Sequence, residues 1–133
     1  MTAPTPYLHF PGTASEALTF YQGVFGGELT LITNGDMGRT DGTASAIGHG
    51  MLVGPVSLFA ADADQKQTPF EASGLMFSLL GVTDSATLTE WFRGLSDGGT
   101  VVDDLQVRPW GDSDGQVRDK FGLLWLIGFE PGK

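Results

Sequence analysis

Residues 104–128 read DLQVRPWGDSDGQVRDKFGLLWLIG, and this stretch decides the fold class. It predicts a strand, a glycine-containing loop, a short strand, a turn at residues 119–122 and a final apolar strand. The apolar run at residues 123–127 is bounded by glycines and is too short for a stable helix, so we expect a buried strand there. Short connections between successive strands favour antiparallel pairing at this end of the chain.

A helix is predicted between Thr13 and the glycine pair at residues 26–27. Thr13 and Glu16 have the spacing of a capping box, in which the threonine oxygen accepts from an early backbone N–H and the glutamate reaches back. The glycines supply the left-handed conformation that often ends a helix. Apolar residues at helical spacing should form its buried face: Ala14, Ala17, Leu18, Tyr21 and Phe25.

The other elements of the first half are strands. Alternating or apolar runs predict strands at residues 7–10, 28–33, 45–53 and 56–61. Turn-forming residues fill positions 34–42, where we expect a mobile loop. Residues 62–74 are polar, contain Pro69 and lack periodicity, so they are the expected linker.

The same order of elements starts again after this linker. A strand at residues 75–82 precedes a helix that Asp84 or Thr87 can cap, and a strand at 100–107 follows it. The pair at residues 20–21 recurs as the pair at 91–92, and glycines 26–27 recur as 98–99. We therefore predict one α+β domain over residues 1–133, built from two strand–helix–three-strand modules at about 4–62 and 75–130, each with a curved mixed sheet.

The composition excludes several classes of function. A chain of 133 residues with 41% hydrophobic and 17% charged residues is an ordinary globular domain. The absence of cysteine excludes disulfides and thiolate sites. The net charge of −9 argues against nucleic acid and anionic membranes as partners. No apolar run is long enough to span a membrane, so a cytoplasmic protein is expected.

Eight short motifs in order carry a family resemblance, at residues 6–10, 16–21, 24–27, 47–51, 98–99, 105–106, 110–111 and 119–122. Together they resemble the PhnB-like branch of the vicinal-oxygen-chelate superfamily, which contains the glyoxalases, bleomycin-resistance proteins and extradiol dioxygenases. The resemblance covers essentially the whole chain. It implies a paired βαβββ fold with a cup that binds a small molecule, and usually a homodimer.

The resemblance also implies a place for a divalent metal, and the sequence departs from that pattern. Catalytic members hold the metal with His, Gln or Glu from strands of both modules, whereas Leu126 stands where a glutamate commonly lies. We therefore expect no cofactor. His9 and His49, with Asp62 as a conceivable third ligand, are the alternative metal site, suited to zinc or iron. Otherwise each histidine is a hydrogen-bonded strand residue beside the cup.

Strand parity predicts the ligand-binding residues. If Leu8, Leu80 and Val82 pack under the helices, the opposite faces carry the ligand contacts. His9 is also the candidate catalytic base. Trp110 could close over a ligand, or pack at a sheet edge or dimer interface. The predicted ligand-binding set is Tyr7, His9, Phe77 and Leu79 in the cup, with Gln106, Arg108 and Trp110 at its mouth.

Three functions remain open at this level. The first is a small-molecule-binding protein that has lost most of the usual metal ligands. The second is a metal-dependent lyase, isomerase or dioxygenase that uses His9 and His49. The third is a structural dimeric protein whose cup is filled by its own side chains.

Overall fold

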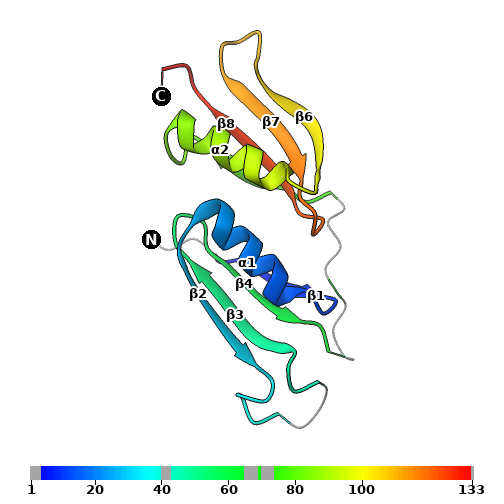
Figure 1. Ribbon diagram of the computed structural model, residues 1–133. Coiled ribbons are helices and arrows are strands. Elements are labelled where there is room, and N and C mark those ends of the chain that lie inside the picture. The colour runs from blue at the N-terminus through cyan, green and yellow to red at the C-terminus, as the bar shows by residue number, and fades with distance from the viewer. Residues whose placement is uncertain (1–3, 40–42, 65–68, 70–73, 133) are drawn as a thin grey trace. The chain divides into compact units, whose positions relative to one another are not determined.

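The computed structural model describes residues 4–39, 43–64, 69 and 74–132 (Figure 1). The chain divides into two compact units, unit 1 (Met1–Phe70) and unit 2 (Glu71–Lys133). Each unit has the order strand, helix and three strands, and no helix among the described residues is long and apolar enough to cross a membrane. The elements are β1 (Tyr7–Phe10), α1 (Ala14–Phe25), β2 (Glu28–Thr33), β3 (Ile47–Val53), β4 (Leu58–Asp62), β5 (Phe77–Leu80), α2 (Ser85–Ser96), β6 (Thr100–Val107), β7 (Ser113–Arg118) and β8 (Leu124–Phe129).

Each unit contains one open, four-stranded sheet. Sheet 1 has the order β1-β4-β3-β2 and sheet 2 the order β5-β8-β7-β6. The first strand of each unit pairs in parallel with its last strand, and the remaining pairs are antiparallel. In each unit the helix lies across one face of its own sheet (Figure 1). The predicted α+β class, with two βαβββ modules and mixed sheets, is confirmed.

In unit 1 the predicted faces of β1 are correct. Leu8 and Phe10 are buried, and Leu8 lies in the same cross-strand row as Ala60 and Gly50. A Cβ added to Gly50 would lie 2.6 Å from Cδ1 of Leu18 in α1, so this row faces the helix. Alternation then leaves Tyr7 and His9 on the opposite face of the sheet.

The start of α1 differs from the predicted capping box. Thr13 makes no side-chain cap hydrogen bond, and its backbone lacks the extended conformation usual for a cap residue. Asp62, at the end of β4, replaces it: Oδ1 accepts from the Ala14 N–H at 2.9 Å and Oδ2 from the Ile47 N–H at 2.9 Å. One carboxylate therefore ties the first turn of α1 to both β3 and β4.

Unit 2 has a conventional helix cap and a compact core. Asp84 accepts from the Thr87 N–H at 2.7 Å, so the first of the two predicted caps is the one used. The cap hydrogen bonds lower the pKa of Asp84. The apolar face of α2 packs over the sheet, and the side chains that form this core are Leu88, Trp91, Phe92 and Leu95 from α2 with Val117, Trp125 and Ile127 from the strands.

The predicted face of β5 is wrong. Phe77 is paired with Trp125 and Leu79 with Ile127, so both belong to the row that α2 covers. Leu80 is 54% exposed and Val82 is 55% exposed, whereas the sequence placed them under the helix. Because side chains alternate along a strand, an error of one residue exchanges its two faces.

The turn predicted at residues 119–122 is organised by the side chain of Asp119. Its buried carboxylate accepts from the N–H groups of Phe121 and Leu123, at 2.8 and 3.2 Å, and from Nε1 of Trp125 at 2.8 Å. These bonds fix the turn and hold the Trp125 ring in the core.

The loop and the linker are described only in part. Residues 34–38 form turns, and the Asn34 amide donates to the Thr43 carbonyl at 3.1 Å. Residues 40–42 of the predicted loop and residues 65–68 and 70–73 of the predicted linker lie outside the described residues. The predicted linker begins too early, because Asp62 is the last residue of β4.

Candidate functional site

Each sheet has one face that its own helix does not cover, and we call this its open face. The candidate functional residues lie on the two open faces. On sheet 1 this face carries an aromatic cluster of Tyr7, His9, His49 and Phe59. The Tyr7 ring lies close to both imidazoles, with centroid distances of 5.4 Å to His9 and 5.6 Å to His49. Phe59 meets Tyr7 and His49 edge-on. The structure thus brings together the two histidines and the tyrosine that the sequence singled out separately.

Tyr7 and His49 are hydrogen-bonded. The distance between Tyr7 Oη and His49 Nδ1 is 2.9 Å. Partial burial raises the pKa of Tyr7, so its hydroxyl keeps its proton at neutral pH and can donate to Nδ1 of a neutral His49. The proton of that imidazole then resides on Nε2. The pair can offer a hydrogen-bond donor to a polar ligand on this face.

The residues of this cluster do not fit a resident divalent metal. Asp62, the third ligand that the sequence allowed, pairs with Phe10 on the helix side and already accepts two backbone hydrogen bonds. Nδ1 of His49 is held by Tyr7. Among the described residues, no group of three or more His, Cys, Asp or Glu side chains is placed to hold a metal ion.

The open face of sheet 2 follows from its strand register. One cross-strand row contains Leu80, Gly128, Asp114 and Gln106, and the adjacent row runs through Ser78, Leu126, Gln116 and Asp103. Leu126, where the resemblance implies a glutamate, points to this face without a metal-binding atom. Polar side chains of β6 and β7 therefore lie beside an apolar strip from β5 and β8.

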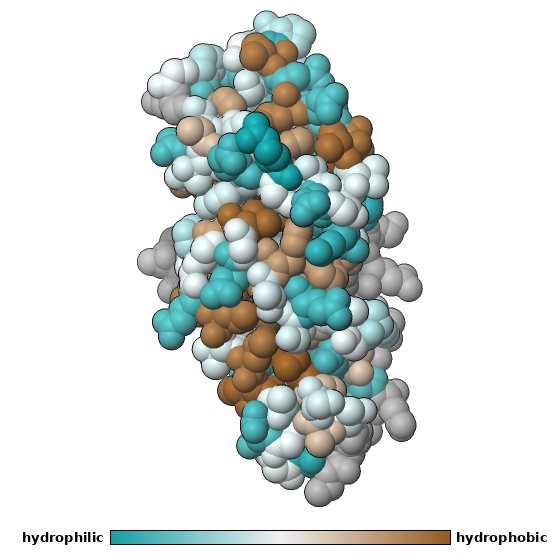
Figure 2. All heavy atoms as spheres, in the orientation of Figure 1, coloured by the Kyte–Doolittle hydropathy of each residue, from teal (hydrophilic) through white to brown (hydrophobic). Residues whose placement is uncertain are grey.

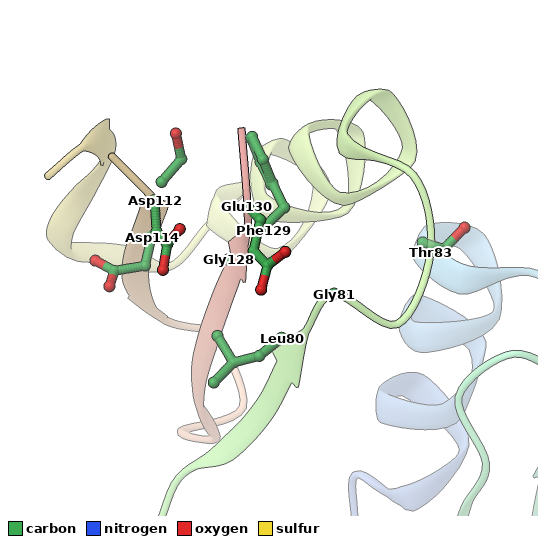
Figure 3. Close-up of a pocket in the computed structure, with 9 residues that line it drawn as sticks. Leu80, Gly81, Thr83, Asp112, Asp114, Gly128, Phe129 and Glu130 are labelled. Atoms are coloured by element: carbon green, nitrogen blue, oxygen red, sulfur yellow. The ribbon is translucent and has the colours of Figure 1, made fainter. Parts of the chain in front are cut away.

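A hollow of about 490 Å³ opens at the end of this face (Figure 3). Its walls come from the end of β5 with the following loop, the start of β7, and the end of β8. Figure 3 shows the acidic side chains at the start of β7 and after β8, with Leu80 on the neighbouring strand. The lining residues are Leu80, Gly81, Thr83, Asp112, Ser113, Asp114, Gly128, Phe129 and Glu130.

Gly128 keeps the wall of the hollow free of a side chain. A Cβ added there would lie 2.7 Å from the Ser113 carbonyl oxygen, 2.9 Å from Cβ of Asp114 and 3.0 Å from Cδ2 of Leu80. Real Cβ atoms do not approach backbone so closely, so any other residue would push the strands or Leu80 aside. The strands can lie this close beside the hollow because residue 128 is glycine.

Gln106 and Arg108 lie next to the hollow in a polar network. Nε of Arg108 donates to Asp114 at 2.6 Å, and Nη2 donates to Asp103 at 2.5 Å. Gln106 donates to Asp103 at 3.0 Å. The two carboxylates raise the pKa of Arg108 further, so it remains charged and engaged with them. The sequence predicted both residues at the mouth of a ligand-binding cup. In the structure they lie beside the hollow, and neither lines it.

Trp110 is held on an ordered turn and points into solvent. Arg108 and Asp112 close the turn through an N–H to carbonyl bond of 2.7 Å, and the Gly111 N–H donates to the Arg108 carbonyl at 2.9 Å. Trp110 is 68% exposed and is not among the residues that line the hollow. Within unit 2 it does not cover the hollow.

Sequence reasoning found only part of this arrangement. Tyr7 and His9 are on the open face of sheet 1, and Gln106 and Arg108 are beside the hollow of unit 2. Phe77 and Leu79 belong to the core side, as described above. The sequence did not predict the hollow. The internal repeat contained a signal for it, because the two helices are offset by 71 residues and this offset maps His9, on the open face of sheet 1, onto Leu80.

Comparisons with known proteins agree with this architecture. The family model of the Glyoxalase/Bleomycin resistance protein/Dioxygenase superfamily matches residues 7–127. Protein YjdN of Escherichia coli (strain K12) is 31% identical over 137 residues, covering 92% of each chain. The structure of PA1353 from Pseudomonas aeruginosa superposes with a TM-score of 0.81 at 30% identity, covering 98% of each chain.

A more distant structure supports the fold alone. The PhnB protein of Bacillus cereus has a TM-score of 0.72 at 18% identity, covering 96% of this chain and 99% of its own. The repeated βαβββ units, the open mixed sheets and the match over residues 7–127 lead to one conclusion: this chain belongs to the glyoxalase/bleomycin resistance protein/dioxygenase superfamily.

Proposed function

We propose that the protein binds a small organic molecule on the open face of sheet 2, without a resident divalent metal. The observation that carries the proposal is the hollow of about 490 Å³ at the end of that face. Its volume is in the range of ligand sites, which combine apolar walls with a few convergent polar groups. Leu80 and Phe129 supply the apolar surface, and Thr83, Asp112 and Glu130 supply the polar groups.

The open face of sheet 1 offers a second set of ligand contacts. Tyr7 and His9 remain the proposed contacts there, because both lie in the exposed aromatic cluster. Tyr7 is 42% exposed, which leaves its ring and hydroxyl accessible. His9 can orient a ligand by a hydrogen bond, or accept a proton if a substrate places one within reach.

A metal-dependent enzyme is the second candidate. The observation in its favour is that His9 and His49 flank the same tyrosine. Elemental analysis after dialysis decides between the candidates, because a structural or catalytic metal remains bound at stoichiometric level. We expect no stoichiometric zinc, iron or nickel, and about one metal ion per chain that is lost in His9→Ala would favour the enzyme.

A homodimer is part of the same proposal. Strand β6 is an edge of sheet 2 and exposes Val101, Val102 and Val107. Edge strands with exposed apolar residues are commonly covered by pairing or by a second subunit. Figure 2 shows apolar residues interspersed with polar ones over the face drawn there.

The binding proposal is tested by fragment screening with ¹⁵N-labelled protein. Fragments that bind should shift the backbone amide signals of Gly81, Ser113 and Gly128. A matched pair of variants then checks the place: Leu80→Trp puts an indole over the hollow, and Val82→Trp puts one at an equally exposed position outside it. We expect only Leu80→Trp to abolish binding. If neither variant changes binding, or no fragment shifts these signals, the proposal is wrong.

A further inference from the structure

We propose that the hollow of unit 2 selects a small organic cation that carries an ammonium-type group on an apolar carbon skeleton. This inference rests on the proposed function. Different residues of the hollow supply the negative charge and the apolar surface that such a ligand needs. The acidic side chains stand on the β7 and β8 walls, and the apolar side chains are Leu80 and Phe129 (Figure 3).

Two carboxylates of the hollow have no counter-charge among the side chains that the structure describes. The side chains of Asp112 and Glu130 form no hydrogen bond or ion pair with any residue that the structure describes. They belong to different strand ends, one just before β7 and one just after β8. Carboxylates that line the same hollow produce a local negative potential, which attracts a cation and repels an anion.

The cation nearest to them in the network is already engaged. Arg108 is shared between Asp103 and Asp114, so one guanidinium serves two carboxylates. None of the nine described residues that line the hollow is Lys, Arg or His. The lining therefore has an excess of negative charge that no described side chain balances.

The apolar wall explains why an inorganic ion would use the site poorly. Leu80 is more than half exposed although it borders a concave surface. Covering it with the carbon skeleton of a ligand removes apolar area from water, which stabilises the complex. The bare backbone at Gly81 and Gly128 lets such a skeleton approach closely, and Thr83 offers a hydroxyl at the rim.

The overall charge of the protein provides a competing explanation, which the test must remove. A chain with a net charge of −9 attracts any cation weakly over its whole surface. The inference requires that affinity depends on Asp112 and Glu130 in particular. Glu28→Gln is the matched control, because it removes the same charge as Glu130→Gln from an exposed residue of unit 1.

The experiment uses three probes that share a phenyl ring: benzylamine, which is a cation at neutral pH, benzyl alcohol and benzoate. Each is titrated into the ¹⁵N-labelled full chain at low salt, and the shifts of the Gly81, Ser113 and Gly128 amide signals give Kd. We expect benzylamine to bind more tightly than benzyl alcohol, and benzoate not to bind. The double variant Asp112→Asn/Glu130→Gln should weaken benzylamine binding by about fivefold or more. The single variant Glu130→Gln should also weaken it, whereas the matched single variant Glu28→Gln should leave it unchanged.

The outcomes separate the inference from the function on which it rests. If benzyl alcohol binds as well as benzylamine and the double variant has no effect, the hollow is a ligand site without a cation preference. If Glu28→Gln weakens benzylamine as much as Glu130→Gln, the attraction belongs to the whole surface. Either result overturns the inference while the proposed function stands. If none of the probes shifts the three amide signals, the inference is also wrong, and the fragment screen judges the proposed function on its own.

Discussion

At the scale of single residues, two carboxylates have a structural role, because they accept hydrogen bonds from backbone N–H groups. Asp119 could be predicted from the sequence, because it bonds to N–H groups two and four residues away. Asp62 could not be predicted, because its partners at Ala14 and Ile47 are 48 and 15 residues distant in sequence. The local pattern at residues 13–16 favoured a capping box, and tertiary structure supplied a different acceptor.

Replacing Asp62 tests this structural role. Asp62→Ala leaves two part-buried N–H groups without their acceptor, so we expect a loss of about 2–3 kcal/mol in the free energy of unfolding. Urea denaturation measures the change. Glu28→Ala, at an exposed residue, is the control and should change the stability by less than about 0.5 kcal/mol. Equal effects of the two substitutions would contradict the assignment.

The cap of α2 predicts a dependence on pH. The Thr87 hydrogen bonds lower the pKa of Asp84 below its ordinary value of 3.8, so the folded state favours the carboxylate. This contribution is present above the unfolded pKa and is lost as the pH falls through the folded pKa. Asp84→Asn keeps a capping oxygen but does not titrate.

The measurement is urea denaturation of the wild type and Asp84→Asn at pH values from about 6 to about 3. We expect the stability advantage of the wild type to shrink towards the acid end of that range. A difference between the two proteins that stays constant with pH would show that Asp84 does not stabilise the helix through its charge.

At the scale of elements, the sequence located most strands and helices, and β5 shows what it could not provide. The bounds predicted for β1, β2 and β6 agree with the structure, since turn residues delimit them clearly. β5 is a short, mostly apolar run with a leucine on each face, so Ser78 gave only a weak internal signal of its orientation. The helix offset of 71 residues, applied to this strand, would have placed Leu80 on the open face.

The two leucines of β5 test the corrected orientation. Leu79 shares a row with buried Ile127, whereas Leu80 borders the hollow and is mostly exposed. We expect Leu79→Ala to lower the free energy of unfolding by roughly 1–2 kcal/mol and Leu80→Ala by less than about 0.5 kcal/mol. Chemical denaturation of both variants measures these losses. A larger loss for Leu80→Ala than for Leu79→Ala would support the orientation predicted from the sequence.

At the scale of the whole molecule, the family and the βαβββ repeat were predictable because many weak motifs occur in one order. The hollow was not predictable, because its walls come from segments that are far apart in sequence, around residues 80–83, 112–114 and 128–130. No motif joins these segments. Their proximity arises from the sheet register, in which Leu80, Gly128 and Asp114 form one row.

A substitution at Trp110 can distinguish ligand binding from self-association. Because it is exposed on an ordered turn and does not line the hollow, we expect it to contribute to the proposed dimer. Trp110→Ala should weaken dimerisation in sedimentation equilibrium and leave the affinity for a fragment in the hollow unchanged. Met37→Ala, which also removes an exposed apolar side chain, is the control and should leave the dimer intact. A wild type that sediments as a monomer at micromolar concentration, or a loss of fragment affinity in Trp110→Ala, would contradict this expectation.

The central claim is that ligand binds in the hollow of unit 2, and the position of a bound fragment in a crystal tests it most directly. Crystals of the wild type are soaked with the fragment that binds most tightly in solution, and the electron density is examined. We expect density between Leu80, Asp114 and Glu130, in contact with the bare backbone at Gly128. Density found only beside Tyr7 and His9, or only at the Trp110 turn, would contradict it.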